Sequence, residues 1–175
     1  SVGVKNDGEI YHGYSLKPVA KRLTEVLKDK KILPKDREVT ITDDCIGEEV
    51  KSIISGDGIF LLENVMFRSG ETSEDDNEVM EFARQLHDTT NCDVYVNADP
   101  VTAHMGQHAS LGPITRLISG PKVAGFLLTQ ELTALDNFMR KPHKPVVAII
   151  GGANASAKTV AMKNLIVYGK VDKLI

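Results

Sequence analysis

The stretch PVVAIIGGANASAKTVAMKNLIVYGKVDKLI, residues 145–175, carries the clearest evidence for the fold class. Its apolar start, 145–150, is typical of a buried strand, and the paired glycines that follow predict a turn. The next residues predict a helix that ends near Gly169, and 171–175 begins a second strand. A strand, a helix and a strand in this order indicate a parallel sheet in an α/β fold.

The same alternation continues through the rest of the chain. An amphipathic helix is predicted at 15–29, where Ser15 is the expected N-cap and Pro18 is tolerated in the first turn. We therefore predict a Rossmann-like, three-layer fold in which helices cover both faces of a parallel sheet. The other expected elements are strands at 37–45, 58–65 and 91–100, helices at 45–55 and 71–88, and a strand or turn leading into a helix at 123–139.

Three of the predicted strand ends are unusually polar. They are TDDC at 42–45, ENVMF at 63–67 and VNADP at 96–100. Ligands of parallel α/β sheets bind beyond the carboxyl ends of the strands, so these ends are the expected place for a site. The acidic run at 71–78 is instead interpreted as a solvated helix start, because acids suit the positive end of a helix dipole.

The composition argues against several classes of protein. Of 175 residues, 42% are hydrophobic and 26% are charged, as in ordinary globular domains. The net charge of -3 argues against a nucleic-acid partner, because phosphate neutralisation needs a basic surface. No apolar run approaches the roughly 20 residues that cross a bilayer, and no signal peptide is visible. We expect an intracellular protein, cytoplasmic or organellar, without membrane contact and with Cys45 and Cys92 reduced.

The segment 152–159 has the outline of a phosphate-binding loop but lacks its second glycine. Ala157 stands where the pattern G-x-x-x-x-G-K-[ST] requires that glycine. A side chain there disfavours the positive φ of the loop. We therefore interpret Gly151 and Gly152 as a turn at the strand end, with Lys158 as a residual anion-binding group.

Seven stretches, in order and spacing, resemble the phosphoglycerate kinase family. The resemblance implies that 1–140 is the N-terminal, substrate-side domain of that Rossmann-like fold, with the family's first strand missing. It implies that 141–175 is a linker and the truncated start of the nucleotide-side domain, with the boundary in the proline-rich segment 139–145. The matching stretches are YSLKPVAKRL (14–23), DDCIGEEVKS (43–52), LLENVMFRSGE (61–71), DVYVNADPVTAHMGQHAS (93–110), VAGFLLTQELTAL (123–135), PVVAIIGGANASAK (145–158) and KVDKLI (170–175).

The resemblance also implies a basic patch for an anionic substrate, and that patch is degraded here. The family's chemistry depends on charge neutralisation by arginine, lysine and Mg²⁺. An arginine replaced by methionine loses its bidentate donor fork. The degenerate positions are Val2 for a histidine, Lys5, Met66 and Met105 for arginines, and Asn154 for a lysine. The residual anion-binding residues would be Lys158, His104 and Arg68.

We therefore expect a phosphoglycerate-kinase-like protein that is catalytically inactive and serves as a structural or binding subunit of a larger protein assembly, without a cofactor. The strand and helix patterns are kept while the cations are lost. The alternative is a divergent active phosphoglycerate kinase, which would use Mg-ATP and 3-phosphoglycerate, with cations from Lys5, Arg68 or Lys158. A third possibility is a sensor that binds a nucleotide or metabolite without turnover.

Three other features have both a functional and a plain interpretation. His104 and His108 are spaced as metal ligands on one helix face, but no third ligand is evident, so we expect no metal and favour a loop with hydrogen-bonded imidazoles. Cys45 precedes an apparent helix start, but adjacent acids oppose thiolate formation, so a buried inert thiol is favoured. Glu63 and Asn64 are interpreted as structural hydrogen-bonding groups.

Overall fold

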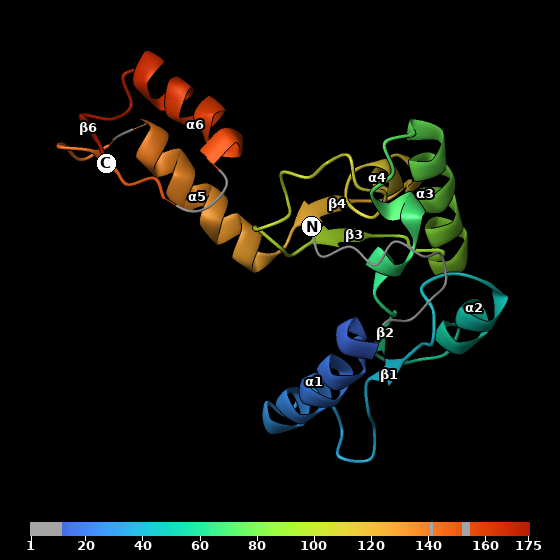
Figure 1. Cartoon of the computed structure of the whole chain (residues 1–175). Helices are drawn as coiled ribbons and strands as arrows, with labels where there is room; N and C mark the ends of the chain where they lie inside the picture. The colour runs from blue at the N-terminus through green and yellow to red at the C-terminus, as the bar shows by residue number, and fades with distance from the viewer. Residues whose placement is uncertain (1–11, 141, 152–154) are drawn as a thin grey trace. The chain divides into compact units, whose positions relative to one another are not determined.

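The computed structural model describes residues 12–140, 142–151 and 155–175 as alternating helices and short strands (Figure 1). The chain divides into two compact units, one that ends at Val123 and one that spans Ala124–Ile175. The domain boundary predicted near residue 140 falls inside the second unit and stays a prediction. Within the described ranges, no helix is long and apolar enough to span a bilayer.

The first unit contains two pairs of short strands with helices between them. In chain order its elements are η1 (His12–Tyr14), α1 (Lys17–Asp29), β1 (Thr40–Ile41), α2 (Glu48–Ile54), β2 (Phe60–Leu61), the 3₁₀ turns η2 (Val65–Phe67) and η3 (Ser69–Glu71), α3 (Asp76–Thr90), β3 (Tyr95–Asn97), α4 (Pro113–Leu117) and β4 (Lys122–Ala124). β1 and β2 are parallel, with Thr40 opposite Phe60, and β3 pairs with β4. The predicted alternation of strands and helices is therefore present.

Residues 145–175 form the strand, helix and strand that the sequence predicts. The elements of the second unit are α5 (Phe126–Arg140), β5 (Val147–Ala148), α6 (Ala155–Val167) and β6 (Lys173–Leu174). β5 and β6 are parallel, with Val147 opposite Lys173. Asp172 strengthens this pairing, because its carboxylate accepts a hydrogen bond from Val146 N at 2.7 Å.

Parallel strands and interleaved helices confirm the α/β class, but the described strands are short and form three separate pairs. β1 ends early for a visible reason. Thr42 N still donates to Leu61 O (3.0 Å), but Thr42 Oγ1 donates to Asp44 O (2.5 Å), which turns the chain. Among the described residues, Val96 of β3 and Val94 just before it remain 54% and 52% exposed.

Two helix starts differ from the predicted ones. α3 begins after its N-cap Asp75, whose side chain accepts a hydrogen bond from Asn77 N at 2.8 Å. This start is several residues later than predicted, because η3 occupies the preceding segment. Ser15 is not the N-cap of α1, since Ser15 Oγ donates to Glu63 at 2.6 Å and α1 has no side-chain cap. A local capping bond thus decides the start of α3, whereas a tertiary contact with Glu63 engages the side chain of Ser15 at the start of α1.

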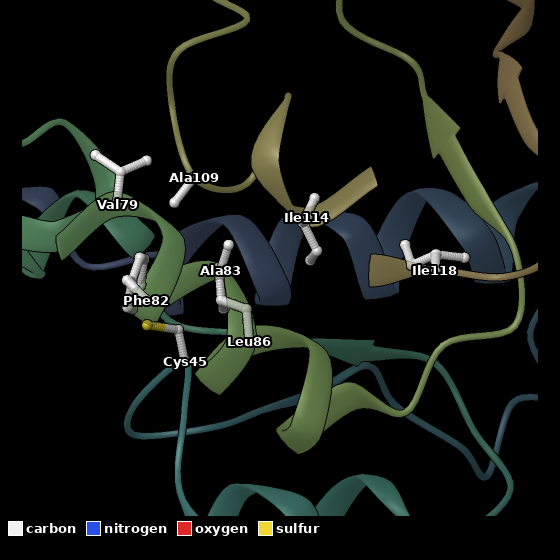
Figure 2. Packing of buried hydrophobic residues seen from close by; sticks show 8 residues of the cluster. All are labelled: Cys45, Val79, Phe82, Ala83, Leu86, Ala109, Ile114 and Ile118. Carbon is white, nitrogen blue, oxygen red and sulfur yellow. The ribbon is translucent and has the colours of Figure 1, made fainter. Parts of the chain in front are cut away.

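The largest core cluster of the first unit surrounds α3 (Figure 2). Val79, Phe82, Ala83 and Leu86 recur at helical spacing and are each at most 4% exposed. The residues that pack with them are Cys45, Ala109, Ile114 and Ile118. The cluster therefore packs the segment after β1, the residues just before α4 and α4 itself against α3.

Cys45 should be unreactive in the folded chain. It is buried, and burial together with the neighbouring Asp44 raises the pKa of its thiol from 9.0 to about 12. This change lowers the thiolate population at about pH 8 roughly a thousandfold. We expect iodoacetamide to leave Cys45 unmodified in a Cys92→Ser variant until denaturant is added, as measured by mass spectrometry. Modification of the native variant at the rate of the unfolded chain would contradict this expectation.

Candidate functional site at the carboxyl ends of the strands

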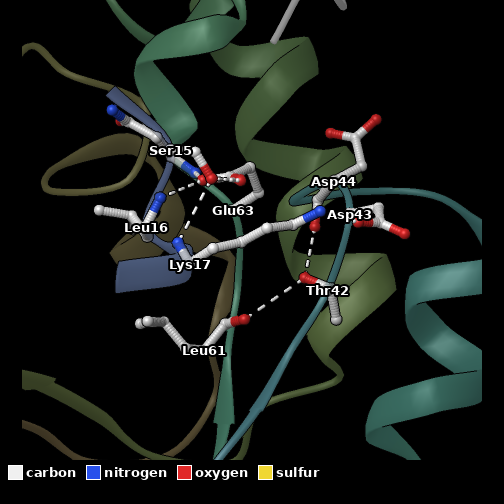
Figure 3. A network of polar contacts seen from close by, with 9 residues as sticks. Ser15, Leu16, Lys17, Thr42, Asp43, Asp44, Leu61 and Glu63 are labelled. Carbon is white, nitrogen blue, oxygen red and sulfur yellow. Dashed lines mark hydrogen bonds and ion pairs between the residues drawn. The ribbon is translucent and has the colours of Figure 1, made fainter. Parts of the chain in front are cut away.

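Glu63 is the buried centre of the polar residues that follow β1 and β2 (Figure 3). It is 2% exposed, and its carboxylate accepts hydrogen bonds from Ser15 Oγ (2.6 Å), Leu16 N (2.8 Å) and Asn64 N (2.8 Å). These three donors satisfy a carboxylate that has been removed from water. Glu63 therefore joins the end of β2 to the start of α1, in agreement with its structural interpretation.

Asp43 and Lys17 form an exposed ion pair at the end of β1. Lys17 Nζ lies 2.8 Å from Asp43 Oδ1, and most of both side chains is in contact with solvent. The hydrogen bond to Asp43, followed by the charge of that residue, raises the pKa of Lys17. A pair this exposed contributes little to stability, but it neutralises a cation beside the strand ends.

Arg68 and Asp44 form a second ion pair, with side chains 25% and 38% exposed. Arg68 Nε lies 3.3 Å from Asp44 Oδ1, and Nη2 of the same arginine contacts Oδ2. Burial opposes ionisation of Asp44, but the hydrogen bonds from Arg68 and from Cys45 N together outweigh it and lower the pKa of Asp44. The guanidinium predicted to bind an anion is therefore held by a carboxylate of the chain.

The pair of Asp44 and Arg68 should make stability depend on pH. A carboxylate with a lowered pKa in the folded chain stabilises it above the unfolded value near 3.8, and this stabilisation is lost as the pH falls through the folded value. We expect Asp44→Asn to lower the free energy of unfolding by about 1 kcal/mol at neutral pH, because both side chains are partly exposed. Urea titrations from neutral pH to about pH 3 should show the difference shrinking, whereas a constant difference would rule out this origin.

Met66 and Met105 lie in two different turns of the first unit. Met66 belongs to η2, where its backbone N donates to Asn64 Oδ1 at 3.0 Å. Met105 belongs to the turns between β3 and α4, where its backbone N donates to Thr102 O at 2.8 Å. Both side chains are half-buried. A thioether is only a weak acceptor, so neither side chain can hold a phosphate as an arginine would.

A second polar cluster surrounds Glu71, which sequence reasoning placed in a solvated run. Glu71 is buried, and Ser110 donates to its carboxylate through N (3.0 Å) and Oγ (2.6 Å). His108 Nδ1 lies 3.9 Å from the same carboxylate. His104 is exposed in a turn, and both histidines lie in a loop rather than on a helix. No local pattern identified Glu71 or Ser110, because their burial depends on a contact between distant segments.

The predicted nucleotide-side residues that the structure describes lie in the second unit. Lys158 of α6 donates a hydrogen bond to the carbonyl of Gly151, which is exposed. Lys158 therefore contacts Gly151, the first of the two glycines at the predicted turn, and its anion-binding role stays a prediction. The other predicted positions lie outside the described residues: Val2, Lys5, Gly152 and Asn154.

The charged groups after β1 and β2 are organised mainly to pair with one another. Lys17 faces Asp43, and Arg68 faces Asp44, so each cation is already partly neutralised by a carboxylate of the chain. In the part of the chain that the structure describes, no three His, Cys, Asp or Glu residues gather in a metal-binding arrangement. The geometry therefore supports structural cross-linking of the strand ends more than anion binding.

The sequence is similar to phosphoglycerate kinases along nearly its whole length. The family model of phosphoglycerate kinase matches residues 3–175. The phosphoglycerate kinase of Citrifermentans bemidjiense is 40% identical over 173 residues, and that of Aquifex aeolicus is 42% identical over 165 residues. These alignments cover 96% and 92% of this chain but 38% and 37% of the relatives. The chain thus spans less than two fifths of the length of these curated relatives.

Solved structures show the same likeness. The phosphoglycerate kinase of Pyrococcus horikoshii matches with a TM-score of 0.72 at 23% identity, over 91% of this chain and 38% of that one. The phosphoglycerate kinase of Coxiella burnetii matches with a TM-score of 0.64 at 28% identity, over 97% of this chain and 38% of that one. These likenesses confirm the α/β, Rossmann-like fold. From the family model and the curated relatives together, the chain belongs to the phosphoglycerate kinase family.

Proposed function

We propose that this chain is part of a non-catalytic member of the phosphoglycerate kinase family, which acts as a structural or binding subunit of a larger protein assembly. The observation that carries the proposal is the pairing of Arg68 with Asp44. Arg68 is the cation nearest in sequence to Met66, where the family resemblance implies an arginine. Its guanidinium is held by a carboxylate, so it is poorly placed to replace the missing charge.

The chemistry of phosphoryl transfer explains why these losses matter. The reaction depends on positioning and on neutralising charge that develops on the transferred group. Removing one cation that stabilises such a transition state costs roughly 10²–10⁵ in rate. Met66 and Met105 stand at two positions where the resemblance implies such cations. The nearby Lys17 is paired with Asp43. The buried core around α3 and the bonds of Glu63 give the chain an ordered scaffold without those cations.

The alternative is a divergent active phosphoglycerate kinase, with Mg-ATP or Mg-ADP as the nucleotide. It is favoured by the identity of about 40% to relatives that carry this name. Under this alternative Arg68 would leave Asp44 when substrate binds, and Lys5 and Lys158 would supply further charge. The two functions differ most directly in turnover.

A coupled phosphoryl-transfer assay on the full-length protein tests the proposal. The substrates are 3-phosphoglycerate and Mg-ATP, and the enzyme from Aquifex aeolicus serves as the positive control. We expect turnover at least about 10³-fold below the control, because two charge-neutralising side chains are replaced. Turnover in the ordinary kinase range of about 1–100 s⁻¹ would establish the alternative. Size-exclusion chromatography of a native extract should place the protein in a large assembly, and a free monomer would contradict the subunit role.

A further inference from the structure

Glu71 joins two segments that lie 39 residues apart in the sequence. Its carboxylate accepts hydrogen bonds from Ser110 N (3.0 Å) and Ser110 Oγ (2.6 Å), and its backbone carbonyl accepts one from Ala109 N (3.1 Å). Glu71 and Ala109 are both buried. Water therefore cannot readily replace these bonds, and a donor that lost its acceptor here would stay unsatisfied.

The other groups around this carboxylate hold Ser110 from a second side. Tyr95 of β3 donates through its hydroxyl to Ser110 O at 2.9 Å, and His108 Nδ1 lies 3.9 Å from Glu71 Oε1. Burial raises the pKa of Glu71, and the hydrogen bonds from Ser110 partly offset this rise. Burial, followed by the charge of Glu71, raises the pKa of Tyr95. Ser110 is thus fixed between η3 and β3.

The residues just before Ser110 form turns with local hydrogen bonds. Asp99 Oδ1 accepts from Val101 N (2.9 Å), Met105 N donates to Thr102 O (2.8 Å), and His108 N donates to Met105 O (3.0 Å). Local bonds of this kind maintain the shape of the turns. The bonds of Glu71 do something different, because they set where the turns lie relative to η3.

We infer that Glu71 is a positioning residue, which fixes the segment carrying His104 and Met105 against the segment carrying Met66 and Arg68. The inference rests on the proposed function in one respect, namely that these segments form the former substrate site. The contacts themselves are independent of that assignment. These contacts explain how the two segments keep a defined position relative to each other. They do so although methionines stand at the two positions, 66 and 105, where the resemblance implies substrate-binding arginines.

Hydrogen–deuterium exchange of the full-length chain tests the positioning directly. Glu71→Ala should raise amide exchange in 101–110 about 10- to 100-fold, because two donors of Ser110 lose a charged acceptor. Exchange in α1 should change little. Glu71→Gln should retain most of the protection, since its amide oxygen can accept from Ser110 N while its amide nitrogen donates to Ser110 Oγ.

The matched control is Glu78→Ala, which removes an exposed carboxylate bonded to Ser73 Oγ at 2.7 Å and should leave exchange in 101–110 unchanged. If Glu71→Ala does not fold, Ser110→Ala provides the test, because it removes only one of the two bonds to the carboxylate. Its increase in exchange should be smaller and should stay within 101–110. No local increase in Glu71→Ala, or in Ser110→Ala where that variant is used, would overturn the inference, as would an equal increase throughout the first unit.

Substrate affinity provides a second readout. In a Met66→Arg, Met105→Arg background, Glu71→Ala should weaken 3-phosphoglycerate binding at least about tenfold, because the two arginines would no longer be held in a common position, while Glu71→Gln should retain it. If the arginine background binds no substrate, the assignment of the former site is wrong, and the exchange results still decide the role of Glu71. The two failures are therefore distinguishable.

Discussion

Glu63→Ala should lower the free energy of unfolding by about 3–5 kcal/mol. Glu63 is 2% exposed and accepts hydrogen bonds from Ser15 Oγ, Leu16 N and Asn64 N over 2.6–2.8 Å. Alanine would remove the acceptor of these three half-buried donors, and each donor left unsatisfied costs about 1–3 kcal/mol. Urea denaturation followed by far-ultraviolet circular dichroism measures the change, which suits a chain without tryptophan.

Two variants control this prediction. Glu63→Gln keeps the side-chain volume and one acceptor oxygen, so the expected loss is intermediate, about 1–3 kcal/mol. Asp43→Ala removes a carboxylate from the same region, but Asp43 and its partner Lys17 are both exposed, so the loss should be much smaller than that of Glu63→Ala. Equal losses for Glu63→Ala and Asp43→Ala would show that burial of Glu63 does not organise the strand ends.

Met66→Arg combined with Met105→Arg should raise the affinity of the full-length protein for 3-phosphoglycerate about 10²–10⁴-fold. Each arginine would add charge-assisted hydrogen bonds to the anion, worth about 1.5–3 kcal/mol apiece. Both side chains are half-buried, and an arginine has a similarly unbranched stem, so the exchange does not require a different backbone. Isothermal titration calorimetry at several salt concentrations measures the gain, which should weaken as salt increases.

Controls separate a specific site from added charge. Met80→Arg adds a cation on α3 and should leave the affinity nearly unchanged, because Met80 is not a position where the family resemblance implies an arginine. Met66→Leu with Met105→Leu should bind no better than the natural chain. A gain with Met80→Arg equal to that of the double variant would mean that the effect is non-specific. Tight binding by the natural chain would mean that the site was never lost.

Several elements could be predicted from the sequence, although their bounds could not. The helix around α1 follows from apolar periodicity, and the strand–helix–strand unit at 145–175 follows from an apolar run, the paired glycines after it and a second apolar segment. The strands proved shorter than their apolar runs, because side chains such as Thr42 replace the ladder with turn contacts. The start of α3 shifted for a similar reason, since the capping bond of Asp75 determines it.

The candidate site was predicted only in part. The polar strand ends included Glu63 and Asp44, and the family resemblance pointed to Arg68 as an anion-binding residue, but the pairing of Arg68 with Asp44, 24 residues away, was not predicted. Glu71 was mistaken for part of a solvated acidic run, and Ser110 was not singled out at all. An exposed carboxylate at an acidic helix start and a buried carboxylate that bonds a distant segment can both occur within the same kind of acidic run. Their environments differ only after distant segments pack together.

By itself, the sequence determined the α/β class and membership of the phosphoglycerate kinase family, because periodicity and the order of motifs are properties of the linear chain. It also determined that Met66 and Met105 cannot supply positive charge. Only the tertiary structure decided which charged groups are already paired within the chain. It brings the Asp44 carboxylate to the Arg68 guanidinium and the Ser110 hydroxyl to the Glu71 carboxylate. The physical reason is that hydrogen bonds and ion pairs act over a few ångströms in space, whatever the separation of the residues along the chain.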